Sequence, residues 1–453
     1  MDSTTRLILP EVREALESDP AALAELTEEM LPADLADLAE QLDPDHAHRL
    51  LAALPIEAVA RLLEQCDDEH RRELFAHLAA HDLATAAAVT DEMAPDDRAD
   101  LYAELPEELR KQLLAEVDPE ESRDIRTLLA YDEDTAGGVM TTDFVALPAT
   151  MTVEQAIDAV RKTAEEMETI YVVYVVDSHG TLHGVVSLRD LVTSPAHKTL
   201  EDIMNPNVVT VDVDTDQEEV AHVMAKYDLL AVPVVDRTHR LVGMITVDDI
   251  LDVVEAEATE DAHRLGAVEP IEQPYMATPV WTIVRARVPW LIALFLVQFV
   301  SGPLLQHFTA SVASATILMW FVPMIMSAGG NAGSQSATLV IRAMSLGETG
   351  PKHALKILSR EVLIGATLGI ILGFVGMVRV ATWNAARSVE MALAIGCAVT
   401  AVIVFGALIG AGIPLLLERL KIDPAVSSTP FVASLVDVGG LVLFFEIARL
   451  FVG

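Results

Sequence analysis

One acidic residue stands inside an apolar stretch near the end of the chain. Asp437 lies in the segment SLVDVGGLVLFF, seven residues after Pro430. If this segment crosses a membrane as a helix, a rise of ~1.5 Å per residue places the carboxylate about 10 Å inside the hydrocarbon layer. A charge at that depth is costly unless it faces water, a cation or a partner. We interpret Asp437 as a functional group, with a neutral Asp bonded to a neighbouring helix as the alternative.

A second polar feature interrupts an earlier apolar stretch. Residues 323–336, PMIMSAGGNAGSQS, combine three glycines with the amides of Asn331 and Gln335. Small residues permit close contact between helices, whereas polar groups at membrane depth are tolerated where they line a wet cavity. Packing alone does not require Asn331 and Gln335 together. We therefore favour a pore lining over a purely structural interface.

A third feature is an acidic segment that precedes the apolar half. It predicts a long helix over 247–268 with seven carboxylates in fourteen residues: Asp248, Asp249, Asp252, Glu255, Glu257, Glu260 and Asp261. Carboxylates spaced i, i+3 or i, i+4 share a helix face and repel one another unless a cation intervenes. Hard cations such as Mg²⁺ choose oxygen ligands. The segment predicts a divalent-cation site, with the solvated acidic surface of a salt-adapted protein as the alternative.

The charge of the chain is unevenly distributed. The 453 residues carry a net charge of −39, although 52% are hydrophobic and the mean hydropathy is +0.37. Residues 271–453 hold 11 basic and 8 acidic residues, and residues 1–270 hold the remaining 19 basic and 61 acidic ones. This acidic excess argues against a nucleic-acid partner, and the apolar second half argues against a single soluble globule. The N-terminus lacks a long apolar run, so we expect no signal peptide and a cytosolic acidic half.

Five apolar segments predict five membrane-spanning helices. They lie at about 288–306, 311–329, 361–383, 390–417 and 429–451, each close to or above the ~20 residues that a span requires. Lys and Arg favour one side of the membrane, as the positive-inside rule describes. Eight flank the predicted inner ends (Arg285, Arg287, Arg342, Lys352, Lys356, Arg360, Arg419 and Lys421) and three the outer ends (Arg379, Arg387 and Arg449). This predicts a cytosolic N-terminus and an outer C-terminus.

Two kinds of repeat organise the acidic half. Residues 20–130 contain Pro-marked breaks, such as Asp43-Pro44 and Asp118-Pro119, between short stretches with helical Leu spacing. Asp followed by Pro is a helix N-cap followed by the first helical residue. We expect helix pairs stacked into a small superhelix.

Residues 138–254 contain a tandem repeat with an offset of 59. Val175-Val176-Asp177 matches Val234-Val235-Asp236, and each unit predicts strand, turn, strand and helix. The repeat resembles a tandem pair of CBS domains, in which a Ser/Thr-x-x-Asp motif often binds the ribose of adenosine nucleotides. The matching residues are Ser187, Asp190, Thr246 and Asp249. They could bind ATP or only cap helices, and both interpretations stay open.

The order of these parts resembles the MgtE family of magnesium transporters and channels over essentially the whole chain. The most specific stretches are PMIMSAGGNAGSQSATLVIRA at 323–343, DPAVSSTPFVASLVDVGG at 423–440, VDDILDVVEAEATEDAHRLGAV at 247–268 and YDEDTAGGVM at 131–140. The resemblance implies a multidomain fold. It comprises an all-α superhelical domain (1–130), two α+β CBS domains (131–202 and 203–246), a connecting plug helix (247–275) and a five-helix transmembrane pore domain (276–453).

The resemblance also implies a function. It predicts a homodimer in the cell membrane that imports Mg²⁺ and is closed when cytosolic Mg²⁺ binds the acidic half. Asp437 and Asn331 match pore positions of the family. Eight further acids match positions that ligate regulatory Mg²⁺: Asp216, Glu218, Asp228, Asp249, Asp252, Glu257, Glu260 and Asp261. Transport of another divalent cation, Mn²⁺ or Co²⁺, is the alternative, because these ions also accept oxygen ligands.

Other classes of protein fit the sequence less well. An intramembrane metalloprotease would need His-Glu-x-x-His or an equivalent within a span, and the sequence has no such motif, so we expect no enzyme. An anion transporter would place Arg, Lys or helix N-termini at the midplane, where Asp437 lies instead. A structural scaffold would leave Asp437 unexplained.

Overall fold

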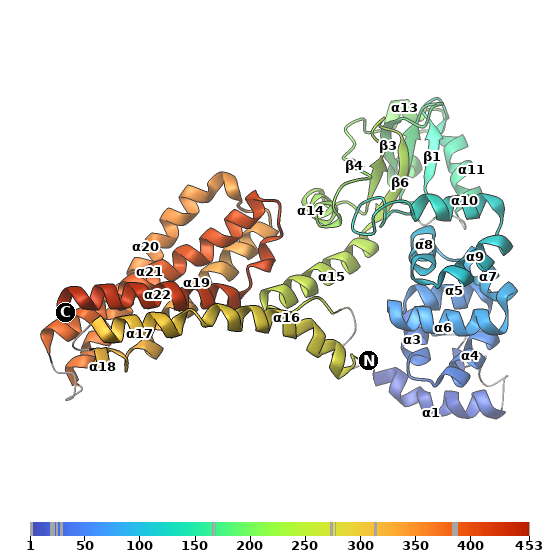
Figure 1. Cartoon of the computed structure of the whole chain (residues 1–453). Helices are drawn as coiled ribbons and strands as arrows, with labels where there is room; N and C mark the ends of the chain where they lie inside the picture. The colour runs from blue at the N-terminus through green and yellow to red at the C-terminus, as the bar shows by residue number, and fades with distance from the viewer. Residues whose placement is uncertain are drawn as a thin grey trace. The chain divides into compact units, whose positions relative to one another are not determined.

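The computed structural model contains two compact units, Met1–Val254 and Glu255–Gly453 (Figure 1). It describes residues 3–18, 23, 26–27, 30–164, 167, 169–271, 275–276, 278–311, 315–382 and 388–452. Arg387, which we assigned to an outer flank, lies outside these residues.

The first unit begins with a superhelix of short helices. They are α1 (Ser3–Ser18), α3 (Pro32–Ala39), α4 (Pro44–Ala53), α5 (Ile56–Glu64), α6 (Asp68–His81), α7 (Leu83–Asp91), α8 (Pro95–Glu104), α9 (Glu107–Glu116) and α10 (Pro119–Leu128). Asp43 caps α4 as predicted, because its carboxylate accepts a 3.2 Å hydrogen bond from the backbone N–H of His46. From α3 to α10, each helix contacts the next but one. This stacking is the superhelix that the Pro-marked breaks predict.

The tandem repeat forms two three-stranded sheets of the same topology. The first sheet contains β1 (Val145–Pro148), β2 (Val172–Val176) and β3 (Leu182–Ser187), and the second contains β4 (Val211–Asp212), β5 (Ala231–Val235) and β6 (Leu241–Thr246). In each sheet the first two strands run parallel and the last two antiparallel. The units also contain α11 (Val153–Thr163), α12 (Leu188–Thr193), α13 (Leu200–Ile203) and α14 (Gln217–Tyr227). The offset of 59 relates β2 to β5 and β3 to β6, as the sequence predicts.

The segment before β1 packs on the second unit of the repeat. The backbone N–H of Ala136 donates to the carbonyl of Thr215 at 2.7 Å, and Thr141 pairs with Met244. Met140 is buried in the same core, together with Ala99 of α8. The superhelix and the repeat therefore share a hydrophobic core.

The second unit is helical. The long helix α15 (Val247–Leu265) leads into it, followed by α16 (Val280–Gln298), α17 (Ser301–Ser311), α18 (Ala315–Leu318), α19 (Val322–Ser345), α20 (Ala354–Thr382), α21 (Val389–Arg419) and α22 (Thr429–Val452), with single 3₁₀ turns at Pro351–His353 and Pro424–Val426. Among the described residues, four helical segments are long and apolar enough to cross a membrane: Val280–Thr309, Pro351–Thr382, Val389–Arg419 and Thr429–Val452. They coincide with the first, third, fourth and fifth predicted spans.

The second predicted span, 311–329, is misplaced. Residues 312–314 lie outside the described part, and the long helix of this region is α19, which runs from Val322 to Ser345. The segment 329–336 therefore lies within a helix rather than at the end of one. The prediction followed the apolar run and ended the span at residue 329. The helix itself continues through glycines and amides, which are not hydrophobic enough to extend a span predicted from hydropathy.

Glycines allow α20 and α21 to approach closely. Gly365, Gly369, Gly373 and Gly376 lie on one face of α20 and are buried. A methyl group added at Gly373 would lie 2.6 Å from the carbonyl oxygen of Gly396 on α21. Helices in lipid associate largely through such close packing of small residues.

We expect Gly373→Val to separate α20 from α21 and to lower thermal stability in detergent. Overpacking of this kind costs roughly 1–3 kcal/mol. Gly412→Val is the matched control, because the nearest atom to its added methyl is Leu358 Cδ2 at 3.9 Å. Unfolding followed by tryptophan fluorescence tests the prediction, which is wrong if both variants lose equal stability.

Candidate functional site

Asp437 lies in α22 and is held by the break between α16 and α17. Its Oδ2 accepts a 2.8 Å hydrogen bond from Nε2 of Gln298, the last residue of α16. Gln298 Oε1 in turn accepts a 2.8 Å bond from the hydroxyl of Ser301, the first residue of α17. The Gln298 donor is a neutral amide. Asp437 is only partly buried, so part of the residue remains accessible. A neutral amide orients a carboxylate without cancelling its charge.

The Asn331 segment of α19 has two faces with different chemistry. Gly330 lies against Ala433 of α22, where an added methyl would have its nearest neighbour at 3.6 Å, and Ser336 is buried with its hydroxyl 2.8 Å from Glu361. Asn331, Gln335 and Thr338 are exposed. Their i, i+4 and i, i+7 spacing places them on one side of the helix. The segment therefore serves packing through its small residues and presents amides on the open side.

The C-terminal half of α15 is anchored to the end of α19, to the start of α22 and to the segment just before α22. Arg264 forms ion pairs with Glu260 of its own helix and with Asp423. Thr429, the first residue of α22, donates its hydroxyl to the carbonyl of Leu265 at 2.9 Å. The Ser345 hydroxyl lies 3.3 Å from Asp261. Partial burial, together with the nearby charge of Asp423, raises the pKa of Asp261.

The N-terminal half of α15 lies beside acids of the superhelix. Burial, followed by repulsion from Glu64 and then from Asp249, raises the pKa of Asp97 to about 8, with Arg71 opposing the shift. Burial likewise raises the pKa of Asp249 to about 6, although Thr246 donates a hydrogen bond to its carboxylate. Asp100 shows the same behaviour, with a pKa of about 7. Burial thus disfavours the charged form of these acids, and the charge of Arg71 does not fully offset this for Asp97 and Asp100.

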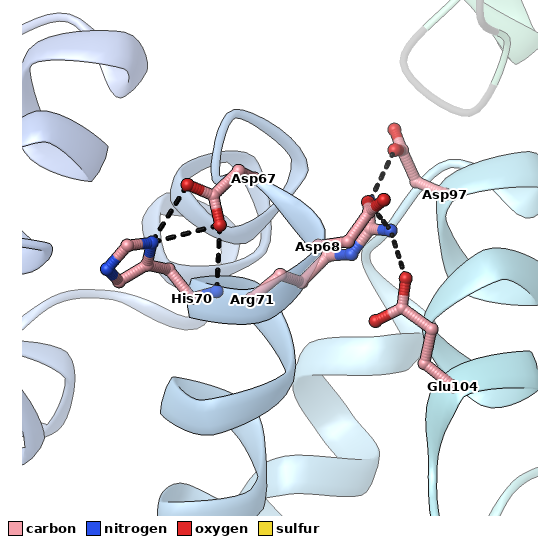
Figure 2. A network of polar contacts seen from close by, with 6 residues as sticks. All are labelled: Asp67, Asp68, His70, Arg71, Asp97 and Glu104. Carbon is pink, nitrogen blue, oxygen red and sulfur yellow. Dashed lines mark hydrogen bonds and ion pairs between the residues drawn. The ribbon is translucent and has the colours of Figure 1, made fainter. Parts of the chain in front are cut away.

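Arg71 supplies positive charge to three of the acids in this region. Figure 2 shows Arg71 of α6 between the carboxylates of Asp68, Asp97 and Glu104, at 2.6, 3.6 and 3.3 Å. The guanidinium side chain is buried, whereas 31% of the Asp97 side chain remains accessible. The Arg71 guanidinium thus pairs with three carboxylates, and Asp97 is the most distant of the three. The accessible side of Asp97 leaves a route by which a cation from solvent can reach the cluster.

The remaining predicted residues have local roles in the described structure. Asp216 caps α14 by accepting a 2.9 Å hydrogen bond from the backbone N–H of Glu218, and Asp228 ends the same helix in a left-handed conformation with φ of 51°. Ser187 caps α12, and its hydroxyl also lies 2.6 Å from the Asp190 carboxylate. Asp252 is exposed, and Glu257 is partly buried. Of the eight predicted regulatory acids, Asp249 is the one whose charge contributes to the raised pKa of Asp97 in the superhelix.

Sequence reasoning did not identify Gln298, Glu64, Asp97 or Asp100. Gln298 could have been noticed, because it is a single amide in the apolar run LIALFLVQFV. The other three had no distinguishing signal, because residues 1–270 contain 61 acids and only the fold selects those that meet.

Three family models match four stretches of the chain. The family model described as MgtE, divalent cation transporter, matches residues 322–447. The MgtE intracellular N domain matches residues 16–134, and the CBS domain matches residues 136–197 and 200–256. The cytosolic domain of the Mg²⁺ channel MgtE, solved in complex with ATP, is 41% identical with a TM-score of 0.51, covering 54% of this chain and 99% of that one. The soluble part of a magnesium transporter is 34% identical with a TM-score of 0.53, covering 56% and 99%.

Relatives extend this similarity to the full length. The magnesium transporter MgtE of Thermus thermophilus is 39% identical over 97% of both chains. The protein of the same name from Bacillus subtilis is 32% identical over 94% of this chain and 93% of its own. The relatives are named as transporters and not as enzymes. Given this coverage and the matching order of domains, the chain belongs to the MgtE family of divalent cation transporters.

Proposed function

We propose that this protein imports Mg²⁺ across the cytoplasmic membrane through a pore formed by two copies of the chain. The observation that carries the proposal is the open polar face of α19 beside α22, which bears Asp437. Amides and a carboxylate are not tolerated against hydrocarbon and need water or protein. A second copy placed against this face would enclose them, with Asn331 and Asp437 lining the path. This arrangement leaves the N-terminus in the cytosol and the C-terminus outside.

The donor chemistry suits Mg²⁺. This ion sheds its waters reluctantly and is usually bound by one or two carboxylates with several waters retained. Asp437 would attract the ion, while Gln298 and Asn331 offer amides to its water shell. Inward movement follows the membrane potential, which contributes ~2.3 kcal/mol per elementary charge at 100 mV. The relatives named as magnesium transporters support this ion over Mn²⁺ and Co²⁺.

We further propose that cytosolic Mg²⁺ closes the pore by binding the acidic half. The donor set around Asp97, Asp100, Glu64 and Asp249 consists of carboxylate oxygens with raised pKa values, which is the chemistry that a hard cation relieves. Further ligands are proposed at Asp216, Glu218, Asp228, Asp252, Glu257, Glu260 and Asp261. Binding at the first half of α15 would hold this helix in place. Its second half is anchored beside the start of α22, so the same helix would fix the base of the pore.

Adenosine nucleotides are a proposed second ligand of the CBS pair. The structure with ATP in a chain 41% identical to this one supports the proposal. The residues concerned are Ser187 and Asp190 in the first unit and Thr246 and Asp249 in the second. The Ser187 hydroxyl caps α12 and the Thr246 hydroxyl donates to the Asp249 carboxylate, so nucleotide binding would have to use or displace these contacts.

Replacement of Asp437 tests the pore. We expect Asp437→Ala to reduce Mg²⁺ uptake into liposomes at least about tenfold, since it removes the charge that offsets ion dehydration. Gln298→Leu should give a smaller loss, because the carboxylate remains but loses its orientation. Glu446→Ala is the control on the same helix, where Glu446 pairs with Arg449 at 2.9 Å. Full uptake by Asp437→Ala would remove this residue from the pore, and equal uptake of Mn²⁺ or Co²⁺ would favour the alternative cargo.

The raised pKa of Asp97 predicts a pH dependence. Between the ordinary carboxyl pKa of 3.8 and about 8, the folded state holds a proton that the unfolded state releases, so stability falls as pH rises through this range. In EDTA, thermal stability of the full-length protein should therefore be lower at pH 8 than at pH 6. Mg²⁺ should restore more stability at pH 8 because it competes with protons.

Asp97→Asn should reduce both the pH dependence and the Mg²⁺ effect. Asp158→Asn is the control, because Asp158 is an exposed acid of α11 paired with Arg161. NaCl at equal ionic strength distinguishes a specific site from general screening. A Mg²⁺ effect that NaCl reproduces in full, or that Asp97→Asn leaves unchanged, would contradict the regulatory site.

The anchor at Arg264 predicts a separation of transport from regulation. We expect Arg264→Ala to retain uptake at low internal Mg²⁺ while the concentration needed for inhibition rises roughly fivefold or more, the lower end of ordinary coupling energies. The reason is that α15 loses its ion pair with Asp423. Patch-clamp or liposome flux at varied internal Mg²⁺ measures the change, with Arg161→Ala as a surface ion-pair control. An unaltered inhibition curve would show that this contact carries no coupling.

A further inference from the structure

Three histidines meet in the superhelix, far along α6 from the Arg71 network. His77 and His81 lie one turn apart on α6, and His48 reaches them from α4. Their ring centroids are 4.3 Å apart for His48 and His81, 4.6 Å for His77 and His81, and 5.3 Å for His48 and His77. The packing of α4 on α6 brings the three imidazoles together.

One ring nitrogen of this cluster donates to the backbone, and two others are buried without a partner among the described residues. His81 Nδ1 lies 2.8 Å from the carbonyl oxygen of His77. A carbonyl only accepts, so Nδ1 carries the proton and Nε2 of the neutral ring keeps a free lone pair. His48 Nδ1 and His77 Nε2 are buried and have no hydrogen-bond partner among the described residues. Buried polar atoms without partners are rare and need an explanation.

The spacing of the rings suits a shared metal ion. A Zn–N bond of ~2.0–2.1 Å in tetrahedral geometry places the centroids of two imidazole ligands about 5 Å apart. The observed separations lie close to this value. Histidine ligands usually donate their other ring nitrogen to a carbonyl or carboxylate, which is the contact that His81 makes. As the rings lie, their ligand nitrogens do not all meet within 4.8 Å of one another. Metal binding would therefore require His48 and His77 to rotate about χ2, a soft torsion, towards Nε2 of His81, whose ring keeps its contact with the carbonyl.

We propose that His48, His77 and His81 form a binding site for a borderline transition-metal cation such as Zn²⁺, Ni²⁺ or Co²⁺, with water as a further ligand. Imidazole suits these ions, whereas Mg²⁺ prefers oxygen. The site is therefore chemically distinct from the carboxylates proposed for Mg²⁺. It would allow the cytosolic region to bind a second class of metal without competition from Mg²⁺.

A neighbouring group has a simpler explanation. The ligand atoms of Glu40, Asp67 and His70 all lie within 4.8 Å of one another. However, His70 Nδ1 is already 2.8 Å from the Asp67 carboxylate, which also caps α6 (Figure 2). Asp43 and His46 repeat this contact at 2.6 Å at the start of α4. The recurrence marks a capping motif of the superhelix, so we assign no metal there.

Co²⁺ spectroscopy tests the histidine site directly. The full-length protein, purified through a tag that contains no histidine, is titrated with Co²⁺ in excess Mg²⁺ so that oxygen sites are filled. We expect one equivalent to give the intense visible absorption of low-coordinate Co²⁺, and Zn²⁺ to displace it. His81→Asn and His77→Asn should each weaken binding at least about tenfold, because a ligand is lost.

The controls keep the outcome decisive. His81 is exposed, so His81→Asn should fold normally, which gel filtration and thermal unfolding verify, and this variant decides the matter if His77→Asn fails to fold. His70→Asn removes a histidine from the same helix and should leave Co²⁺ binding unchanged. The proposal is overturned if wild type shows only the weak absorption of six-coordinate Co²⁺, or if His81→Asn binds as tightly as wild type.

Discussion

A carboxylate that leaves bulk water needs a positive partner, and this chain provides few. Its first 270 residues hold 61 acids and 19 bases, so the fold cannot neutralise every acid that it brings together. Arg71 is shared among three carboxylates, and Asp97 at 3.6 Å receives the weakest part of that charge. The same shortage recurs at Asp437, whose described partner is a neutral amide. At both places the missing charge is what a divalent cation supplies, which is why one ion can serve as both cargo and regulator in the proposed mechanism.

In the mechanism we propose, the helix α15 connects these two deficits. Its 19 residues extend ~28 Å at 1.5 Å per residue, with Asp249 near the start and Arg264 near the end. The pair with Asp423 and the hydrogen bond from Thr429 tie its last turn to the segment that begins α22. A cation bound near Asp249 would therefore act on the base of the helix that carries Asp437. Coupling requires only that the ion prefer one position of α15, so weak sites can act together.

Local chemistry was predictable from the sequence, and long-range contacts were not. The Asp43 cap and the exceptional position of Asp437 each follow from residues a few positions apart, and the offset of 59 between the sheets follows from the repetition of a local pattern. The span placed at 311–329 failed because hydropathy cannot distinguish a polar helix face from the end of a helix. Asp97 could not be selected from the many acids of the superhelix, since its role depends on Arg71 and Asp249 reaching it through folding. The contact of Gln298 with Asp437 depends likewise on the packing of α16 against α22.

The composition of α19 follows from two demands on one helix. Where it meets α21 and α22, only glycine and alanine allow backbones to approach, and a methyl at Gly333 would lie 3.0 Å from the carbonyl oxygen of Gly406. On the side of α19 that does not pack on these helices, Asn331 and Gln335 are exposed. Contact of these amides with lipid would be unfavourable. A helix built only for packing would place apolar side chains there, and a helix built only for a pore would not need the glycines. Close packing of α19 against α22 places the helix that bears Asn331 and Gln335 next to the helix that bears Asp437. The low hydropathy of α19 is the reason that its bounds could not be predicted from the sequence. This low hydropathy is thus a consequence of the function we propose for the helix.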